Sequence, residues 1–361
     1  MSSPESTTVG VEARALSVRL HRSLDALRDP WERLAERSGN VFATWDWADA
    51  WWRAFGSGGE LVVGECVTAS GEAVAILPLH RVRYGLRFVG NGPADELGPV
   101  CAPEDAPVAA SALREPLERR PLGARMLLAE RLRGDISWDG ALGGRTLQRE
   151  SSPALPFHGR SWEEFLASRS RNFREQVGRR ERKLAREHEI AFRLTEYPDR
   201  LEADFETLGR LHGARWGGRS EAFGAQLASF HLDFARRALE RGWLRLWTLE
   251  VDGSPAAAWY GLRFAGADSY YNGGRDPAWD SYAVGFVLLS HTVRDAFNSG
   301  MTEYRFLRGD EPYKDRFAEA DAGVETRLVG TGALGRLAAG ATARAAPRLP
   351  WRLRSRLGID A

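Results

Sequence analysis

The sequence predicts an α/β (α+β) protein of two lobes, each a mixed, mostly antiparallel sheet flanked by helices. The chain has 361 residues, which is long for one compact domain and comfortable for two. Two largely apolar segments, Glu60–Val82 and Leu244–Phe264, are each interrupted by a Ser-Gly or Asp-Gly turn, and each predicts a β-hairpin. A strand and a helix are expected after each hairpin, so the same order of elements occurs twice, although no repeat is visible by residue identity.

In the first half, two helices have start signals. Asp29 as N-cap, with Pro30 at the first helical position, predicts a helix over Pro30–Arg37. Thr44 as N-cap predicts a helix over Trp45–Phe55, and its aromatic residues cover more than one face, which indicates burial. The other expected elements are the strands Leu16–Leu20, Leu86–Gly90 and Met126–Arg131 and the helix Pro107–Arg119.

In the second half, residues 133–160 are broken by Gly and Pro and are expected to connect the lobes. Ser161 and Glu164 then form a capping-box pattern, which predicts a helix start. The segment Arg169–Arg186 carries eight basic residues and little apolar content. The remaining expected elements are the helices Asp204–Trp216, Phe223–Arg241 and Tyr282–Asn298 and the strands Asp268–Asn272, Thr302–Leu307 and Thr326–Val329.

These elements give the expected domain boundaries. Residues 1–13 are predicted to be disordered, 14–150 to form the first lobe, and 151–332 to form a second, larger lobe. Residues 333–361 are rich in Ala and Arg and predict a basic, helical C-terminal tail. This tail is either a peripheral helix or a segment that contacts a membrane surface.

Composition limits the function classes. The net charge is +1, so any anion site must be local. Cys66 and Cys101 lie in apolar contexts and predict buried thiols in a reducing compartment. The histidines are not at metal-ligand spacing from one another, a Cys or a carboxylate, so no metal is expected. We find neither a secretory signal nor an apolar stretch of the roughly 20 residues that span a bilayer, and we expect a cytoplasmic enzyme or binding protein.

Several catalytic motifs are excluded by their context. Gly330–Gly335 matches the dinucleotide pattern GxGxxG, but the chain ends before a full βαβ unit could follow. Gly56–Gly59 lacks the Lys-Ser/Thr of a phosphate loop. The sequence also contains no GxSxG elbow, HExxH pair or EF-hand loop, which disfavours classical serine hydrolysis, kinase and zinc chemistry.

The most informative region is the start of the helix expected near Tyr282. Residues 270–277 leave a strand into a Gly-rich turn, and Gly285 lets a ligand approach the backbone of the following helix closely. A helix N-terminus presents unpaired N–H groups and partial positive charge, so it can hold a diphosphate without a phosphate loop. The candidate cofactor-binding residues are therefore Arg275, Tyr282, Val284 and Gly285.

This order of hairpin, strand, turn, helix and strand resembles the core of GNAT acyltransferases. Three segments resemble a two-lobed GNAT-like family found beside bacterial cellulose- and biotin-synthesis genes: 211–216 (LHGARW), 306–314 (FLRGDEPYK) and 90–95 (GNGPAD). The resemblance spans residues 42–317. This family is similar in architecture to the Fem-type aminoacyltransferases, which also have tandem GNAT lobes and take their acyl group from aminoacyl-tRNA.

The resemblance implies a reaction and a layout of the site. Coenzyme A would place its pyrophosphate at the turn before the central helix and its pantetheine arm along the preceding strand. The oxyanion contact would be a backbone N–H near Tyr270–Asn272. The Fem-type comparison implies that Tyr313–Phe317 borders the active site. No tightly bound cofactor is expected, because acyl-CoA would be a co-substrate.

Four residues are candidates for catalysis, each with an alternative. Asp95 is expected to bind or deprotonate the substrate amine, or else to form an Asx-turn. Asp310 and Glu311 follow a strand end and either orient and deprotonate an amine or are loop residues that are solvated or pair with Arg308. Arg308 is either an ion-pair partner of Asp310 or a substrate contact. Lys314 either neutralises an oxyanion or holds a substrate phosphate or carboxylate, or is a surface lysine. The candidate substrate-binding residues are Arg308, Tyr313, Tyr270, Asn272 and Trp216.

Three functions remain open at this point. The first is N-acyl transfer from acyl-CoA to an amine of a small-molecule, cell-envelope or natural-product substrate. The second is aminoacyl transfer from aminoacyl-tRNA, which the basic Arg169–Arg186 helix favours as a tRNA contact; the alternative for that helix is a solvated surface. The third is a non-catalytic binding protein that keeps the fold. The acceptor amine, the acyl chain and the oligomeric state are left open.

Overall fold

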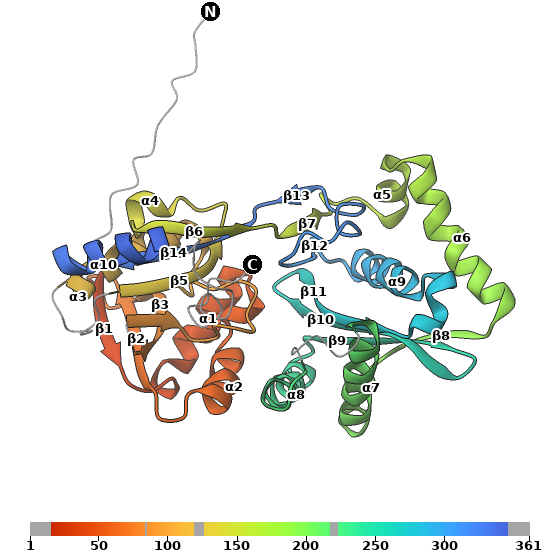
Figure 1. The fold of residues 1–361 in the computed structure, drawn as a ribbon, viewed down its shortest axis with the longest axis horizontal. Coiled ribbons are helices and arrows are strands. Elements are labelled where there is room, and N and C mark those ends of the chain that lie inside the picture. Colours follow the sequence, from red (N-terminus) through yellow and green to blue (C-terminus); the bar gives the residue numbers. More distant parts are fainter. Residues whose placement is uncertain (1–15, 84, 119–125, 217–222, 346–361) are drawn as a thin grey trace, which may run out of the picture.

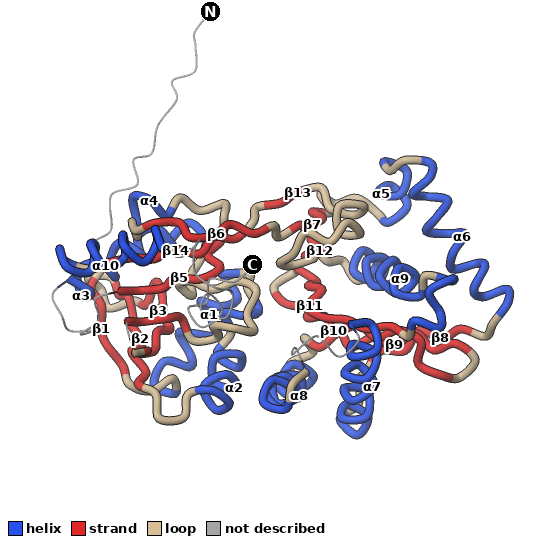
Figure 2. The backbone as a smooth tube through the Cα atoms, viewed as in Figure 1, coloured by secondary structure: helices blue, strands red, loops and turns tan. Residues whose placement is uncertain are grey.

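The computed structural model describes residues 16–83, 85–118, 126–216 and 223–345. They form two lobes, each with a seven-stranded sheet (Figure 1). The predicted disordered segment 1–13 and the last part of the predicted tail, 346–361, lie outside the described residues. Helices and strands alternate with loops in both lobes, and Figure 2 shows this α+β arrangement directly. The predicted fold class is confirmed.

The first sheet has the strand order β1-β2-β3-β4-β5-β14-β6. Its neighbours are antiparallel except β4 and β5, which are parallel. Helices α1 and α3 both contact β3. The elements of this lobe are the strands β1 (Ser17–His21), β2 (Glu60–Val67), β3 (Ala73–Val82), β4 (Gly85–Phe88), β5 (Met126–Arg133), β6 (Arg145–Glu150) and β14 (Val324–Gly330), and the helices α1 (Arg28–Ser38), α2 (Trp45–Phe55), α3 (Ala106–Glu118), α4 (Trp138–Ala141) and α10 (Gly332–Ala345).

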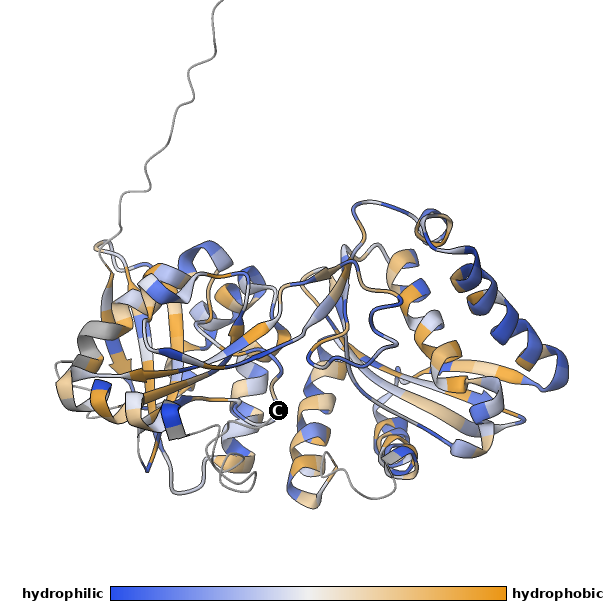
Figure 3. Cartoon of the chain, turned by 45° about the horizontal axis from the view of Figure 1, so that its top comes forward, coloured by the Kyte–Doolittle hydropathy of each residue, from blue (hydrophilic) through white to orange (hydrophobic). Residues whose placement is uncertain are grey.

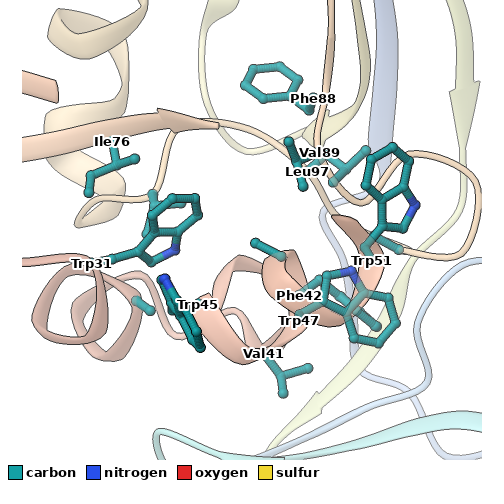
Figure 4. Close-up of a cluster of buried hydrophobic side chains, with 14 of the residues drawn as sticks. Trp31, Val41, Phe42, Trp45, Trp47, Trp51, Ile76, Phe88, Val89 and Leu97 are labelled. Carbon is teal, nitrogen blue, oxygen red and sulfur yellow. The ribbon is translucent and has the colours of Figure 1, made fainter. Parts of the chain in front are cut away.

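Helix α2 shows how the local sequence determines an element. The Thr44 side chain accepts a hydrogen bond from the Trp47 backbone N–H, so the helix begins where the N-cap predicts. Its tryptophans enter a buried cluster with those of neighbouring segments (Figure 4). Helix α1 differs from expectation: it begins at Arg28, two residues before Pro30, so Asp29 lies in its first turn and is not the N-cap.

The second sheet has the strand order β13-β7-β12-β11-β10-β9-β8. Helices α7 and α8 cover one face, and α9 with α6 covers the other (Figure 1). The Ser161–Glu164 capping box is present at the start of α5. The elements are the strands β7 (Pro153–Pro156), β8 (Ile190–Leu194), β9 (Leu244–Val251), β10 (Ser254–Phe264), β11 (Ala267–Arg275), β12 (Glu303–Arg305) and β13 (Ala320–Asp321), and the helices α5 (Trp162–Ser168), α6 (Arg171–Glu187), α7 (Pro198–Trp216), α8 (Ala225–Glu240) and α9 (Val284–Asn298).

Strand β11 is longer than predicted, and this matters for the site. It pairs in parallel with β12 only over Ala267–Ser269, and beyond that point the two strands separate. β11 continues along β10 as far as Arg275, with a bulge at Tyr271, so the predicted Gly-rich turn is strand. A Cβ at Gly274 would lie 2.2 Å from the His212 backbone nitrogen, so the glycine allows α7 to pack closely on this strand.

The two sheets are joined by a two-stranded ribbon. β6 of the first sheet runs into β7 of the second, and β13 runs back into β14 (Figure 1). Glu150 is paired with Val324, and Pro153 with Asp321, so both crossings lie side by side. The segment 324–330 therefore belongs to the first sheet and not to the second lobe, where the sequence analysis placed it. The expected connection, 133–160, also contributes strands to both sheets.

The lobes share a hydrophobic core. The Trp47 ring of α2 makes edge contacts with Phe230 and Phe234 of α8, with centroids 4.9 and 4.8 Å apart. At the rim of this interface, Arg237 of α8 lies 2.7 Å from the Asp49 carboxylate of α2. This packing fixes the position of one lobe on the other and defines the space between them.

Candidate functional site

A cavity of about 380 Å³ lies beside the separated part of β11. Its walls come from β10, β11 and the first turns of α9, and the apolar part includes Ala257, Trp259 and Leu288. We call this space the donor cavity. Its position follows from the strand separation, because β11 beyond Ser269 has no strand on the β12 side.

The N-terminus of α9 faces the donor cavity. Ala283 is the N-cap, with the left-handed φ of 54°, and its carbonyl accepts the first helical hydrogen bonds from the N–H groups of Phe286 and Val287. The N–H groups of Val284 and Gly285 precede these bonds, as expected for a helix start. The first turn contains no acidic residue, so this end of the helix suits an anion.

The predicted cofactor-binding residues are not all equivalent in the structure. Arg275 and Gly285 line the donor cavity, and the Arg275 guanidinium lies 2.7 Å from the Asp280 carboxylate at its edge. The Val284 side chain is buried in the core, so only its backbone is available. Tyr282 points toward α6, where its hydroxyl donates a hydrogen bond to Glu187 at 2.9 Å.

Two further spaces follow on the other side of β11. A junction cavity of about 260 Å³ shares Arg215, Tyr270, Gly273 and Tyr313 with the donor cavity, so the two adjoin. An interlobe cleft of about 1370 Å³ lies beyond it. Strand β11 thus lies between a small apolar cavity and a wide cleft. The residues that line both the cleft and the junction cavity are Asp95, Tyr271, Asn272 and Arg308.

Comparison with known proteins supports this geometry. Residues 171–315 match the model of the acetyltransferase (GNAT) domain. FemX has a similar fold, with 12% identity, 87% of this chain and 95% of that chain covered, and a TM-score of 0.59. L-PGS from Bacillus licheniformis is 14% identical, with 88% and 96% covered and a TM-score of 0.55. The chain is a two-lobed GNAT-like protein. Its fold is that of tandem GNAT-like lobes, and the family match lies in the second lobe.

A third structure has the same architecture over nearly its whole length. It is the C-terminal DUF2156 domain of an Agrobacterium fabrum protein assigned as a lysylphosphatidylglycerol synthetase, with 15% identity, 90% of this chain and 98% of that chain covered, and a TM-score of 0.56. No curated protein matches the chain in sequence. These likenesses are all below a quarter identity, so they show a shared fold alone.

In this GNAT-like protein, Arg308 joins the two lobes at the cleft. Its guanidinium lies 3.3 Å from the Asp95 carboxylate and 2.8 Å from that of Glu150, both in the first lobe. Burial lowers the pKa of Arg308, but the two carboxylates outweigh it and raise the pKa. The predicted neighbour of Arg308 was Asp310, and the structure instead pairs it with Asp95 and Glu150. Asp310 is exposed and lines the interlobe cleft.

Lys314 is buried, and this rules out the surface lysine considered above. Only 3% of its side chain is exposed, and Nζ contacts the carbonyl oxygens of Leu307, Arg308 and Gly309 at 3.2, 2.6 and 3.4 Å. Leu307 and Gly309 have positive φ values of 56° and 118°, so the loop curls around the ammonium group. The three carbonyl groups and the Glu311 carboxylate, 2.8 Å from Nζ, enclose the ammonium group, and Lys314 holds the loop in place.

Glu311 differs from Lys314 because its carboxylate still has free acceptor capacity. Its Oε2 lies 2.8 Å from the Lys314 ammonium but accepts no hydrogen bond within the described part of the chain. Its side chain is 39% exposed and lines the junction cavity. Glu311 therefore combines a nearby positive charge with a partly exposed side chain, whose Oε2 is buried, at the junction cavity.

The other predicted residues surround β11. Tyr270 stacks on Trp259 with centroids 3.5 Å apart and lies 6.1 Å from the Tyr313 ring; burial and the neighbouring Tyr270 raise the pKa of Tyr313. Asn272 lines the junction cavity, and its Oδ1 accepts from the Gly273 N–H. Trp216 ends α7, and its side chain lies outside the described residues.

Sequence reasoning missed three residues of the site. Tyr271 occupies the bulge of β11 and donates a hydrogen bond to the Pro93 carbonyl at 2.8 Å, across the lobes; burial and the Asp95 charge raise its pKa. Glu150 lies within residues 133–160, which the sequence analysis assigned to the connection between the lobes. His231 lines the cleft, and burial lowers its pKa to about 3, so it is neutral at pH 7. Of these three residues, only Glu150 could have been suspected from the sequence, because it is a charged residue next to Ser151-Ser152.

The described residues contain no group of three His, Cys, Asp or Glu side chains arranged to hold a metal ion. None of the helices within the described ranges is long and apolar enough to cross a membrane.

Proposed function

We propose that the protein transfers an acyl group from acyl-CoA to an amine. The observation that carries this proposal is the series of three adjoining spaces around β11. A donor that enters from the α9 side and an acceptor that enters from the interlobe cleft would meet at the junction cavity. This layout meets the main requirement of acyl transfer, which is to hold two reactants together in one orientation.

The donor side fits a thioester on a phosphorylated carrier. The first N–H groups of α9 and Arg275 would bind the diphosphate, and the apolar wall with Trp259 would contact the acyl-bearing arm. The free edge of β11 offers backbone N–H groups near Tyr270–Asn272 that would stabilise the carbonyl oxygen as negative charge develops on it. Acyl-CoA is a substrate in this proposal, and no resident cofactor is needed.

The acceptor side supplies carboxylates for an ammonium group. Asp95 and Asp310 line the cleft and would orient the amine, while Glu311 in the junction cavity would accept its proton. The neutral nitrogen then attacks the thioester carbonyl, the C–S bond breaks, and the thiolate leaves. The amide nitrogen loses a second proton as the intermediate collapses, and the leaving thiolate takes up one proton. Arg308 and Lys314 act as positioning residues in this scheme.

A second candidate is aminoacyl transfer from aminoacyl-tRNA to an amine. The fold shared with FemX and L-PGS and the basic outer surface of α6 favour it. It uses the same junction cavity and the same proton acceptor, and only the carrier of the acyl group differs. A non-catalytic binding protein would use the cleft without Glu311 taking part in chemistry.

The test is a donor screen followed by a turnover assay. Calorimetry and thermal unfolding of the purified chain with acetyl-CoA, longer acyl-CoAs and aminoacyl-tRNA would identify the donor, because a ligand of the folded state raises the melting temperature. Release of free thiol in the presence of an amine library would then measure transfer. Binding of an acyl-CoA with thiol release supports the proposal. Binding of aminoacyl-tRNA alone would replace it with the second candidate, and binding without turnover would favour the third.

A further inference from the structure

Four cations gather beside the donor cavity. Arg179, Arg180 and Lys183 are on α6, and Arg316 is in the loop after β12. We call them the α6 cation cluster. Figure 3 shows that α6 is hydrophilic along its exposed side, whereas α9 beneath it is largely hydrophobic. The cluster therefore lies where a charged helix covers an apolar one.

The cluster surrounds the start of α9. The Arg180 and Arg316 guanidinium carbons each lie 4.8 Å from the Phe286 ring centroid, and Lys183 Nζ lies 4.6 Å from that of Tyr282. Tyr282 and Phe286 stand on either side of Ala283–Gly285, where the helix begins. Phe286 also lines the donor cavity. The aromatic rings thus hold the cations at the rim of that cavity.

These cations lack the carboxylate partners that other arginines have. Within the described ranges, no Asp or Glu carboxylate oxygen lies within 4 Å of the cluster's side-chain nitrogens. Elsewhere on α6, Arg171 pairs with Glu175 at 2.7 Å and Arg186 with Glu187 at 2.7 Å. Burial and the charges of Arg316 and Arg179 lower the pKa of Arg180. Glu187 interacts with Lys183 at longer range, but like charges held together without an ion-paired carboxylate repel one another, and a bound anion would relieve this repulsion.

We propose that the α6 cation cluster binds a phosphate group of the donor that is separate from the diphosphate at α9. The inference rests on the proposed function, since it concerns the same donor cavity. Guanidinium groups bind phosphate oxygens through paired N–H donors, and Lys183 adds a point charge. In a coenzyme A thioester this group is the phosphate monoester on the ribose; in an RNA carrier it is a backbone phosphodiester. Both present the same chemistry to the cluster.

The test compares coenzyme A with 3′-dephospho-coenzyme A, which lacks only the ribose phosphate. Calorimetry would use the full chain, the variant R180Q/R316Q, and the control R171Q/R186Q, which removes the same charge from paired positions of α6. We expect the full chain and the control to bind coenzyme A about tenfold more tightly than the dephospho form. In R180Q/R316Q the two ligands should bind equally.

Further variants separate binding from folding. Arg179→Gln changes an exposed member of the cluster that contacts none of the aromatic rings, and it should lower the preference for coenzyme A severalfold with an unchanged melting temperature. R180K/R316K keeps the charge and should restore part of the preference.

Each outcome is decisive. Equal binding of the two coenzyme A forms by the full chain overturns the inference and leaves the proposed function intact. If neither form binds, an RNA minihelix is the next ligand. Minihelix binding that is lost in R180Q/R316Q and kept in the control assigns the phosphate to RNA and refutes acyl-CoA as donor. The inference is also overturned if the minihelix does not bind, or if both variants weaken its binding equally.

Discussion

The two lobes have the same order of strands around their central helix but differ in what they leave open. In the first lobe, β4 is followed by α3 and then by β5, which pairs with β4 in parallel at Leu86 and Arg87. In the second, β11 is followed by α9 and then by the parallel strand β12. The difference lies in the length of the strand before the helix: β4 has four residues and β11 has nine.

In the first lobe the space beyond the short strand is filled. The chain returns after β4, and Val100 pairs with Ile76 of β3 through hydrogen bonds of 3.0 and 2.8 Å. Arg87 also joins β4 to Glu130 of β5 with two hydrogen bonds. The turn before α3 carries Glu104 and Asp105, the turn before α9 carries Asp280, and neither helix has an acidic residue in its own first turn. One topology therefore gives a donor cavity in the lobe where the strand before the helix is long.

The largest expected effect is on catalysis in the second lobe. Glu311→Gln keeps the shape of the side chain and removes its ability to take a proton, so kcat should fall about 1000-fold. Steady-state thiol release with a saturating amine measures it. Glu104→Gln, at an exposed position in the turn before α3 of the first lobe, removes the same charge and should leave kcat unchanged. A fall of less than a few fold in Glu311→Gln would mean that another group accepts the proton.

The next effect is on stability, through the close contact between β11 and α7 at Gly274. Gly274→Val places atoms against the His212 backbone and should lower the free energy of unfolding by about 3 kcal/mol, measured by urea denaturation. Gly213→Ala is the matched change on the facing helix, where a Cβ would meet nothing within 4 Å, and it should be neutral or slightly stabilising. Equal effects of the two changes would show that the contact does not limit the packing of α7.

A smaller effect concerns acid sensitivity at the cleft. The folded-state pKa of His231, about 3, lies below the ordinary value of 6.5, so the unfolded chain binds the proton first. The stability from this group is complete above pH 6.5 and is lost as the pH falls toward 3. Between pH 7 and pH 5 the full chain should lose about 2 kcal/mol more than His231→Phe. Exposed His158→Asn should lose as much as the full chain, and equal losses in all three would contradict the assignment.

The smallest effect tests the charge at the start of α9. Gly285→Glu puts a carboxylate in the first turn of this helix, a turn that has no acidic residue, and should weaken acyl-CoA binding about tenfold in calorimetry. Gly285→Gln, of similar size, serves as the control for bulk and should weaken binding much less. If both substitutions weaken acyl-CoA binding equally, the size of the side chain and not its charge determines the effect at this position.

Local signals in the sequence predicted much of this fold. The Thr44 cap, the capping box at Ser161, and the two hairpins depend on residues that are neighbours in the chain, and all are present. The extension of β11 through Gly273-Gly274 was missed because glycines there serve the approach of α7, which is a tertiary contact. The placement of β14 in the first sheet was missed for the same reason, since its partners are far away in the sequence.

The candidate site was predicted less completely than the fold. The motif at residues 306–314 identified Arg308, Glu311 and Lys314, and all three lie at the cleft or the junction cavity. The motif could not distinguish their environments: Lys314 is enclosed by carbonyl groups, while Arg308 bridges to Glu150, which is more than 150 residues earlier. Burial and pairing are properties of the folded chain, so they separate a positioning residue from a reactive one only after folding.

The ribbon between the sheets has a consequence for how the protein is made. Strands β1 to β6 are synthesised first. In the finished sheet, however, β14 lies between β5 and β6, and β14 is synthesised after the entire second lobe. Until then β5 and β6 each have an unpaired edge that invites incorrect pairing. The lobe synthesised first is therefore completed last, and we expect a nascent or truncated chain that stops before Val324 to depend on chaperones to stay out of aggregates.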